Sequence, residues 1–491
     1  MALDADFLLK SHGNHQLELV VNYPLDPEDK KGHLELDVYF FIPRQLGVNR
    51  KSWSVDKFYR YLSIYTRYKT PAVPLKQLVK KNCHNSPLFR IRKIFKKNGN
   101  YHHVDYEMLI TELRSLLNII EHHNSCLKIQ MATEKMELLQ SIPDDMKQVQ
   151  VSLDELGGEF LHPDSVTGLK ESYDLCREGI SLQIEKAAGR VYEALSTRKE
   201  QKNDSSPGKA LKTGMKSCIQ HIREQQDYRC FHSFCSQDGE VLGRNTEETL
   251  YREHEIKKWG HQSLYLTSES SSLISRMVQL LFGLAAAIAM SIAVMASLLS
   301  LRFFESGSLA WALIAVSAYI LKDRIKDGLR AFFLRFIPDI YADRLKRLIN
   351  PSTGKRGGLF KERLRFPDLS ELPPEVSRTR VPASQAENIL HYRKKTEIRS
   401  LVLREKQEDI AALSDILRLD ISSWFIRMDK AVETVYSLEE DTLRQAEVSR
   451  TYRIPALVSL NLKGEALPLI RSFLIILDSR GIRRIEESNL S

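Results

Sequence analysis

The most constraining feature of this sequence is an apolar stretch from Met277 to Leu301. None of its 25 residues carries a formal charge, although 27% of the residues of the whole chain are charged. A helix rising about 1.5 Å per residue would make it roughly 37 Å long, more than the ~30 Å of bilayer hydrocarbon. We therefore expect a membrane span. The alternative is a buried core helix, although such helices rarely run past about 18 apolar residues without a charge.

A second apolar segment, Leu309–Leu321, follows a short polar interruption. It makes only about 20 Å of helix, which is less than a full span. Basic side chains that reach the lipid headgroups would allow the helix to continue at its C-terminal end, namely Lys322, Arg324, Lys326 and Arg330. We expect a two-helix transmembrane hairpin over residues 273–336. A re-entrant or interfacial second segment is the alternative.

The distribution of charge predicts the orientation of this hairpin. Residues 322–365 hold 13 Lys/Arg and five Asp/Glu, whereas the net charge of the whole chain is +9. Positive charge stays on the cytoplasmic side, so we expect a multi-pass protein of the cytoplasmic (inner) membrane with both termini in the cytoplasm. Basic and acidic residues nearly balance before residue 322. The excess of basic residues therefore lies next to the predicted span, where it would contact membrane lipids. We expect membrane lipids as partners and no nucleic-acid binding.

Small residues recur every four positions along the first apolar segment. Gly283, Ala287 and Ser291 form one row, and a second row follows Ala285, Ala289, Ala293 and Ser297. Rows of small side chains let helices approach closely in a membrane. We expect this packing surface to contact either the second segment or another copy of the chain, which would make a homo-oligomer.

Before the membrane the chain divides into three predicted regions. Residues 1–98 form an α+β domain in which segments 16–23 and 33–42 alternate like strands and pair as an antiparallel hairpin. Residues 99–200 form a long, coiled-coil-like antiparallel helical hairpin, whose first helix ends at Pro143. Residues 201–272 form a linker with short helices.

After the membrane we expect a basic juxtamembrane segment over 337–384 and a C-terminal α+β domain over 385–491. Within that domain, Asp409–Leu419 and Asp429–Arg450 have apolar spacing typical of helices. Ala456–Leu462, Arg471–Leu477 and Ile482–Ile485 resemble strands, the last two joined by a turn that contains Gly481. The predicted fold class is an α+β multidomain membrane protein.

One cluster has the residue types of a metal site: Cys218, His221, Cys230 and Cys235. Thiolate and imidazole are the ligands that zinc prefers, and four protein ligands would make such a site structural. The spacing is irregular, and the alternative is ordinary thiols and a histidine on a helix. We expect no other cofactor. Six cysteines in 491 residues do not form a disulfide framework, and on the cytoplasmic side we expect them to be free.

The sequence contains no motif that names a reaction. There is no GxSxG, HExxH or strand-linked GxGxxG, so catalytic residues stay unknown and an enzyme is neither predicted nor excluded. We expect a membrane scaffold or regulatory protein that recruits a cytosolic protein through the helices of residues 104–198. The alternative is a membrane-tethered enzyme whose C-terminal domain acts on a lipid, nucleotide or cell-wall precursor. A pore is disfavoured because the first span holds no charge to line a water path.

Overall fold

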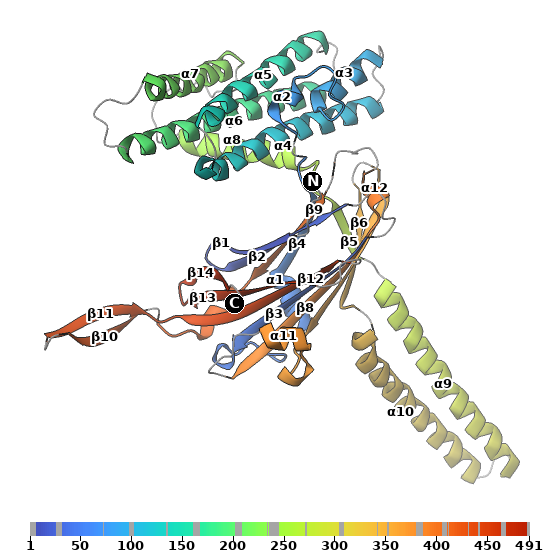
Figure 1. The fold of residues 1–491 in the computed structure, drawn as a ribbon. Helices are drawn as coiled ribbons and strands as arrows, with labels where there is room; N and C mark the ends of the chain where they lie inside the picture. The colour runs from blue at the N-terminus through green and yellow to red at the C-terminus, as the bar shows by residue number, and fades with distance from the viewer. Residues whose placement is uncertain are drawn as a thin grey trace. The chain divides into compact units, whose positions relative to one another are not determined.

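The computed structural model shows a mixed α+β chain with several sheets (Figure 1). It describes residues 6–488 except 26–31, 72, 98–102, 134–135, 161–166, 202–208, 233, 235–244, 271–272, 304–308, 341, 351–352, 380–385, 405–409, 411, 431, 440–441 and 463–467. The chain divides into two compact units. A sheet unit contains residues 1–66, 266–407 and 412–491, and a helical unit contains residues 67–265 and 408–411.

The larger sheet of the sheet unit has eight strands, and every pairing described in it is antiparallel. In spatial order the strands are β14 (Gly481–Ser488), β13 (Leu469–Asp478), β12 (Tyr452–Leu462), β3 (Gly32–Pro43), β8 (Glu387–Ile398), β7 (Arg356–Arg365), β6 (Arg344–Ile349) and β5 (Thr267–Ser270). Apolar and polar side chains alternate along the first part of β3, and its apolar residues Leu34, Leu36 and Val38 are all buried. This alternation explains the place of β3 near the centre of the sheet.

A second sheet of four strands belongs to the same unit. Its order is β1 (Asp6–His12), β2 (Gln16–Pro24), β9 (Ala412–Asp420) and β4 (Leu62–Tyr68). The Phe7 and Phe473 rings lie 6.4 Å apart and link this sheet to the larger one. The short helices of the unit are η1 (Arg44–Leu46), α1 (Val55–Tyr61), η2 (Leu369–Glu371), α11 (Pro374–Thr379), α12 (Ser400–Arg404) and η3 (Ser422–Arg427).

Strands from the two ends of the sequence interleave in both sheets. β3 lies between β8 and β12, and β2 pairs with β9 from Gln16 opposite Asp420 to Pro24 opposite Ala412. The predicted hairpin of segments 16–23 and 33–42 is therefore wrong, because these segments belong to different sheets.

Two predicted helices near the C-terminus are also strands. The segment predicted as a helix over Asp409–Leu419 contains β9, and that predicted over Asp429–Arg450 contains β10 (Val432–Glu439) and β11 (Thr442–Ser449). Apolar residues three and four apart suggested helices, but β9 is buried on both faces and so lacks simple alternation. The three predicted strands after residue 456 are confirmed as parts of β12, β13 and β14. Their last turn holds Gly481 at a φ of +140°.

The predicted juxtamembrane segment, 337–384, also contains regular structure. It includes the end of α10 (Leu309–Ile340), the strands β6 and β7, and the helix α11. Glycines and basic residues within β7 favoured a loop, yet Phe360 and Leu364 are buried on one face of that strand. The pairing of β7 with both β6 and β8 therefore overrides the weak intrinsic preference of this segment for a strand.

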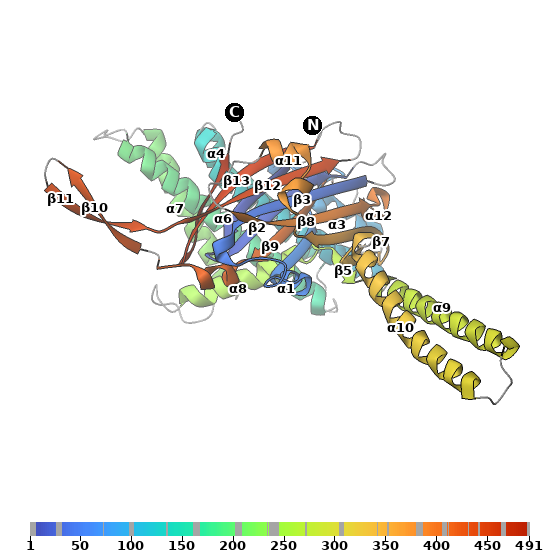
Figure 2. The same cartoon turned by 90° about the horizontal axis from the view of Figure 1, so that it is seen from below.

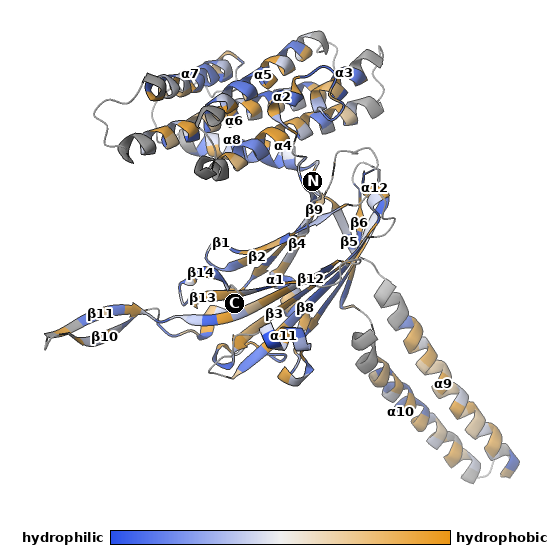
Figure 3. Cartoon of the chain, in the orientation of Figure 1, coloured by the Kyte–Doolittle hydropathy of each residue, from blue (hydrophilic) through white to orange (hydrophobic). Residues whose placement is uncertain are grey.

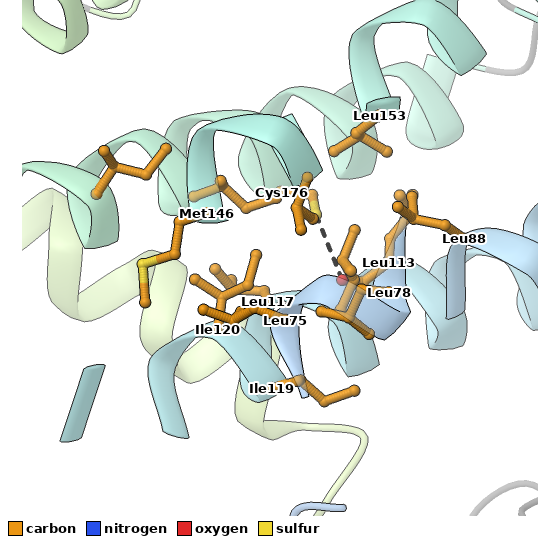
Figure 4. Packing of buried hydrophobic residues seen from close by; sticks show 14 of the residues in the cluster. Leu75, Leu78, Leu88, Leu113, Leu117, Ile119, Ile120, Met146, Leu153 and Cys176 are labelled. Atoms are coloured by element: carbon orange, nitrogen blue, oxygen red, sulfur yellow. Dashed lines mark hydrogen bonds between the residues drawn. The ribbon is translucent and has the colours of Figure 1, made fainter. Parts of the chain in front are cut away.

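The helical unit is built around one apolar core (Figure 4). Its helices are α2 (Leu75–Leu78), α3 (Pro87–Lys97), α4 (His103–Thr133), α5 (Met136–Phe160), α6 (Thr167–Gln201), α7 (Lys209–Phe231) and α8 (Asn245–His261). Apolar residues three and four positions apart along α4 form a seam, which is buried at Leu113, Leu117 and Ile120. The buried Asn124 of this seam donates to the Gln183 carbonyl at 3.1 Å, so its amide is satisfied.

More than two helices surround that core. Pro143 lies inside α5 and does not end a helix as predicted, so the expected two-helix hairpin becomes a bundle in which α6 packs against α4, α5 and α7. Cys176 of α6 lies at the centre, where its thiol donates to the Leu113 carbonyl at 3.3 Å (Figure 4). α8 also packs against α6, so four neighbouring helices share the buried surface of α6.

Candidate functional site

The apolar stretch folds as a pair of long helices, α9 (Leu273–Phe303) and α10 (Leu309–Ile340) (Figures 1 and 2). The pair is inserted between β5 and β6, which are neighbours at one edge of the larger sheet. In that ladder Thr267 lies opposite Ile349 and Ser270 lies opposite Lys346. Both ends of the helical pair therefore connect to adjacent strand positions.

The first helix exposes most of its apolar surface. The window Gln279–Ser300 has a mean hydropathy of 2.2 and is only 11% buried. Figure 3 shows this apolar character along α9. Its exposed large side chains are Leu280, Leu284, Ile288, Met290, Ile292, Val294, Met295, Leu298, Leu299 and Phe303. An apolar surface of this extent indicates contact with lipid or with another apolar surface.

The second helix is apolar in its first part and charged in its later part. Leu309, Leu313, Val316 and Ile320 are exposed, but charged residues begin at Lys322. Among the helices that the structure describes, only α9 is long and apolar enough to cross a membrane. The helical pair is thus present, and a transmembrane role is shown for neither helix.

The two rows of small residues differ in their surroundings. Ala285 and Ala289 are completely buried, and α10 is the helix that packs on α9. Gly283, Ala287 and Ser291 lie on the exposed side, where the Ser291 hydroxyl donates to the Ala287 carbonyl at 2.9 Å. The row at Ala285 therefore forms the contact inside the helical pair, and the row at Gly283 remains accessible.

The four predicted headgroup residues lie along two to three turns of α10. Lys322 has its ammonium 4.0 Å from the centre of the Tyr319 ring, and Lys326 lies 3.4 Å from the Asp323 carboxylate. Arg330 stacks over Phe282 at 5.3 Å, whereas Arg324 is exposed. Their long apolar stems and partial exposure suit residues at a boundary between lipid and water.

The predicted zinc ligands have dissimilar surroundings. Cys218 of α7 is buried in an apolar cluster, and burial raises the pKa of its thiol. His221 has its Nε2 atom 3.0 Å from an Asp144 carboxylate oxygen, Cys230 is exposed, and Cys235 lies outside the described residues. Within the described part of the chain, no group of three or more metal-ligating side chains is brought together.

Sequence reasoning missed a buried ion pair between the two sheets. The Lys394 ammonium of β8 lies 2.6 Å from an Asp415 carboxylate oxygen of β9, and both side chains are almost completely buried. The Thr66 hydroxyl donates to the other Asp415 oxygen at 2.6 Å. Glu362 is buried opposite Lys394 in the ladder and accepts from the Tyr392 hydroxyl at 3.3 Å.

This group of side chains has no local signal in the sequence. Lys394 and Asp415 are separated by 20 residues and belong to strands of different sheets, so only the three-dimensional fold reveals their pairing. Burial and the adjacent Asp415 carboxylate raise the pKa of Tyr23 well above 10 and keep its hydroxyl protonated. Because these groups are enclosed, the arrangement fixes the two sheets to each other and offers no access to a substrate.

Comparison with models of protein families, with curated proteins and with solved structures finds nothing that matches this chain.

Proposed function

We propose that this chain is an integral protein of the cytoplasmic membrane that acts as a scaffold or regulatory protein. The helical pair α9–α10 is its anchor, and both folded units lie on the cytoplasmic side. The observation that carries the proposal is the exposure of the apolar window of α9, only 11% of which is buried. A helix of this hydropathy in the core of a soluble protein would be mostly covered.

Dimensions and energetics support a membrane location for α9. Its apolar window of 22 residues corresponds to about 33 Å of helix, against ~30 Å of hydrocarbon. Each central Leu, Ile, Phe or Val favours insertion by about 0.3–0.6 kcal/mol, and no charged residue opposes them inside the window. The apolar part of α10 is shorter, and Lys322 and Lys326 would extend to the headgroups to complete a second span.

The attachment of both helices to adjacent strands supports a hairpin that returns to the side from which it started. The basic residues of α10 and β6 then lie on the cytoplasmic side, as the positive-inside rule requires. Protease treatment of sealed right-side-out vesicles tests this topology with tags at both termini. We expect both tags to be protected until detergent is added. Cleavage of the C-terminal tag alone would show that α10 does not cross.

The helical unit supports the scaffold role because it is an insertion with adjacent ends. The Tyr68 amide donates to the Leu264 carbonyl at 2.9 Å, so a short link can replace residues 69–263 without moving the flanking strands. We expect this deletion variant to remain in the membrane and to lose its co-purifying cytosolic protein. If the variant retains every partner of the full chain, the helical unit is not the recruiting module.

A further inference from the structure

A two-stranded ribbon in the sheet unit stands apart from the larger sheet. β10 and β11 pair along their whole length, from Val432 opposite Ser449 to Glu439 opposite Thr442. They form a sheet of two strands, and β11 continues after two residues into β12 of the larger sheet. Figures 1 and 2 both show the ribbon projecting beyond that sheet.

The ribbon exposes large apolar side chains and unpaired strand edges. Tyr436 is 61% exposed and Leu438 is 71% exposed, and Val435, Leu443 and Val448 are also exposed. No third strand pairs with either strand in the described part of the chain. A lone two-stranded ribbon is marginally stable in water, and an apolar edge strand is a template for pairing with another chain.

We propose that β10 pairs antiparallel with β10 of a second copy, with Val435 of each chain at the two-fold axis. In an antiparallel pair, two residues opposite each other point to the same face of the sheet. When the two strands are copies related by a two-fold axis, the paired positions therefore differ by an even number, and one residue lies at the axis opposite its own counterpart. A register centred on Val435 pairs residues 432–438 of the two β10 strands with one another. It pairs Thr434 with Tyr436, Glu433 with Ser437 and Val432 with Leu438 across the interface.

The residue types favour this register over its neighbours. Centring on Tyr436 would oppose Glu433 and Glu439 twice, and like charges directly opposite are destabilising. Centring on Thr434 would place Leu438 opposite Lys430. The register on Val435 instead pairs apolar residues with apolar residues and an aromatic ring with a β-branched residue, which are favourable cross-strand combinations.

The residue types that would lie opposite each other also favour β10 over β11 as the interface strand. A β11 pairing centred on Gln445 would place Leu443 opposite Glu447, and one centred on Ala446 would place Val448 opposite an arginine, Arg444. Pairing through β10 creates a four-stranded sheet. On one face of this sheet, Leu438 would lie between Leu443 of its own ribbon and Val432 of the other copy. These three side chains would form one apolar row across the interface.

Cysteine cross-linking of the full-length protein in detergent tests the register. The Val435→Cys variant, with Cys230 and Cys235 replaced by serine, should form a disulfide-linked dimer because opposed residues lie within bonding reach. Glu433→Cys alone and Ser437→Cys alone should form no disulfide-linked dimer, because each cysteine would be about 13 Å from its own counterpart. Mixing these two variants should yield the cross-linked dimer. Absence of the Val435→Cys dimer, or equal cross-linking by Glu433→Cys alone, overturns the proposal.

A matched pair of lysine variants tests the interface without a disulfide. Val435 and Val448 are exposed by 46% and 48% and lie on different strands of the same ribbon. We add Val435→Lys to both the Glu433→Cys and the Ser437→Cys variant and mix the two proteins. This substitution should abolish their cross-linking, because two lysines would meet at the axis. Val448→Lys in the same pair should leave cross-linking intact. Equal effects of the two lysines would contradict pairing through β10.

Discussion

At the scale of single residues, the ion pair between the sheets is the most tightly constrained feature. Lys394 and Asp415 are enclosed, so each needs the other as a counter-charge. Lys394 also has its ammonium 4.0 Å from the centre of the Phe360 ring. Buried pairs of this kind are poor evidence of high stability, but removing one partner leaves an uncompensated charge in the interior.

Replacement of Lys394 by methionine should therefore destabilise the sheet unit strongly. We expect a loss of about 3–5 kcal/mol in the free energy of unfolding, because the Asp415 carboxylate stays buried without its partner. Denaturant titration of the detergent-solubilised protein measures this loss. The double variant Lys394→Met with Asp415→Leu should recover much of it. A double variant as unstable as the single one would show that the ion pair is not the cause.

A second residue-scale prediction concerns Glu121 in the helical unit. Burial alone would raise the pKa of its carboxyl group, but His261 and Lys257, each 3.0 Å away, lower the pKa to about 2. Because this pKa is below that of the unfolded chain, the carboxylate stabilises the fold above about pH 4.5. That stabilisation is lost as the pH falls from 4.5 towards 2.

The Glu121→Gln variant should thus be less stable than the parent at pH 7 by roughly 1.5–3 kcal/mol, the usual value of hydrogen bonds to a charged group. The difference should shrink as the pH falls below 4.5. Chemical denaturation at several pH values measures both effects, with the exposed Glu193→Gln as the control. A difference that stays constant down to pH 2.5 would contradict this account of Glu121.

At the scale of elements, the α9–α10 contact depends on which row of small residues faces inward. Ala289→Leu should force the helices apart and cost about 1–3 kcal/mol, because the position is completely buried. Ala287→Leu, two residues earlier on the exposed side, should have little effect. Detergent-denaturation profiles of the two variants make the comparison. Equal destabilisation would indicate that the Gly283 row is also packed, for example against another copy.

The elements that could be predicted are those with a strong local signal. The apolar length of α9, the seam of α4 and the turn at Gly481 all appear in the sequence as regular spacing or special residues. The identity of β9 could not be predicted, because a strand buried on both faces resembles a short buried helix. The pairing of β3 with β8 and β12 joins residues more than 300 positions apart, and no local pattern encodes it.

At the scale of the whole molecule, two insertions interrupt the sheet unit between neighbouring strand positions. The helical unit occupies residues 67–265, and the α9–α10 pair lies between β5 and β6. This connectivity lets each insertion be removed while the flanking pairs, such as Ser270 opposite Lys346, are preserved. The proposed membrane role can therefore be separated experimentally from the folding of the sheets.

The most direct measurement is the partition of the protein between membrane and soluble fractions after alkaline carbonate extraction. We expect the full chain to stay in the membrane pellet. We expect a variant with residues 272–343 replaced by a short turn to appear folded in the soluble fraction. A full chain that is monomeric and dispersed in buffer without detergent, or a variant that still resists extraction, would contradict the assignment of α9–α10 as the anchor.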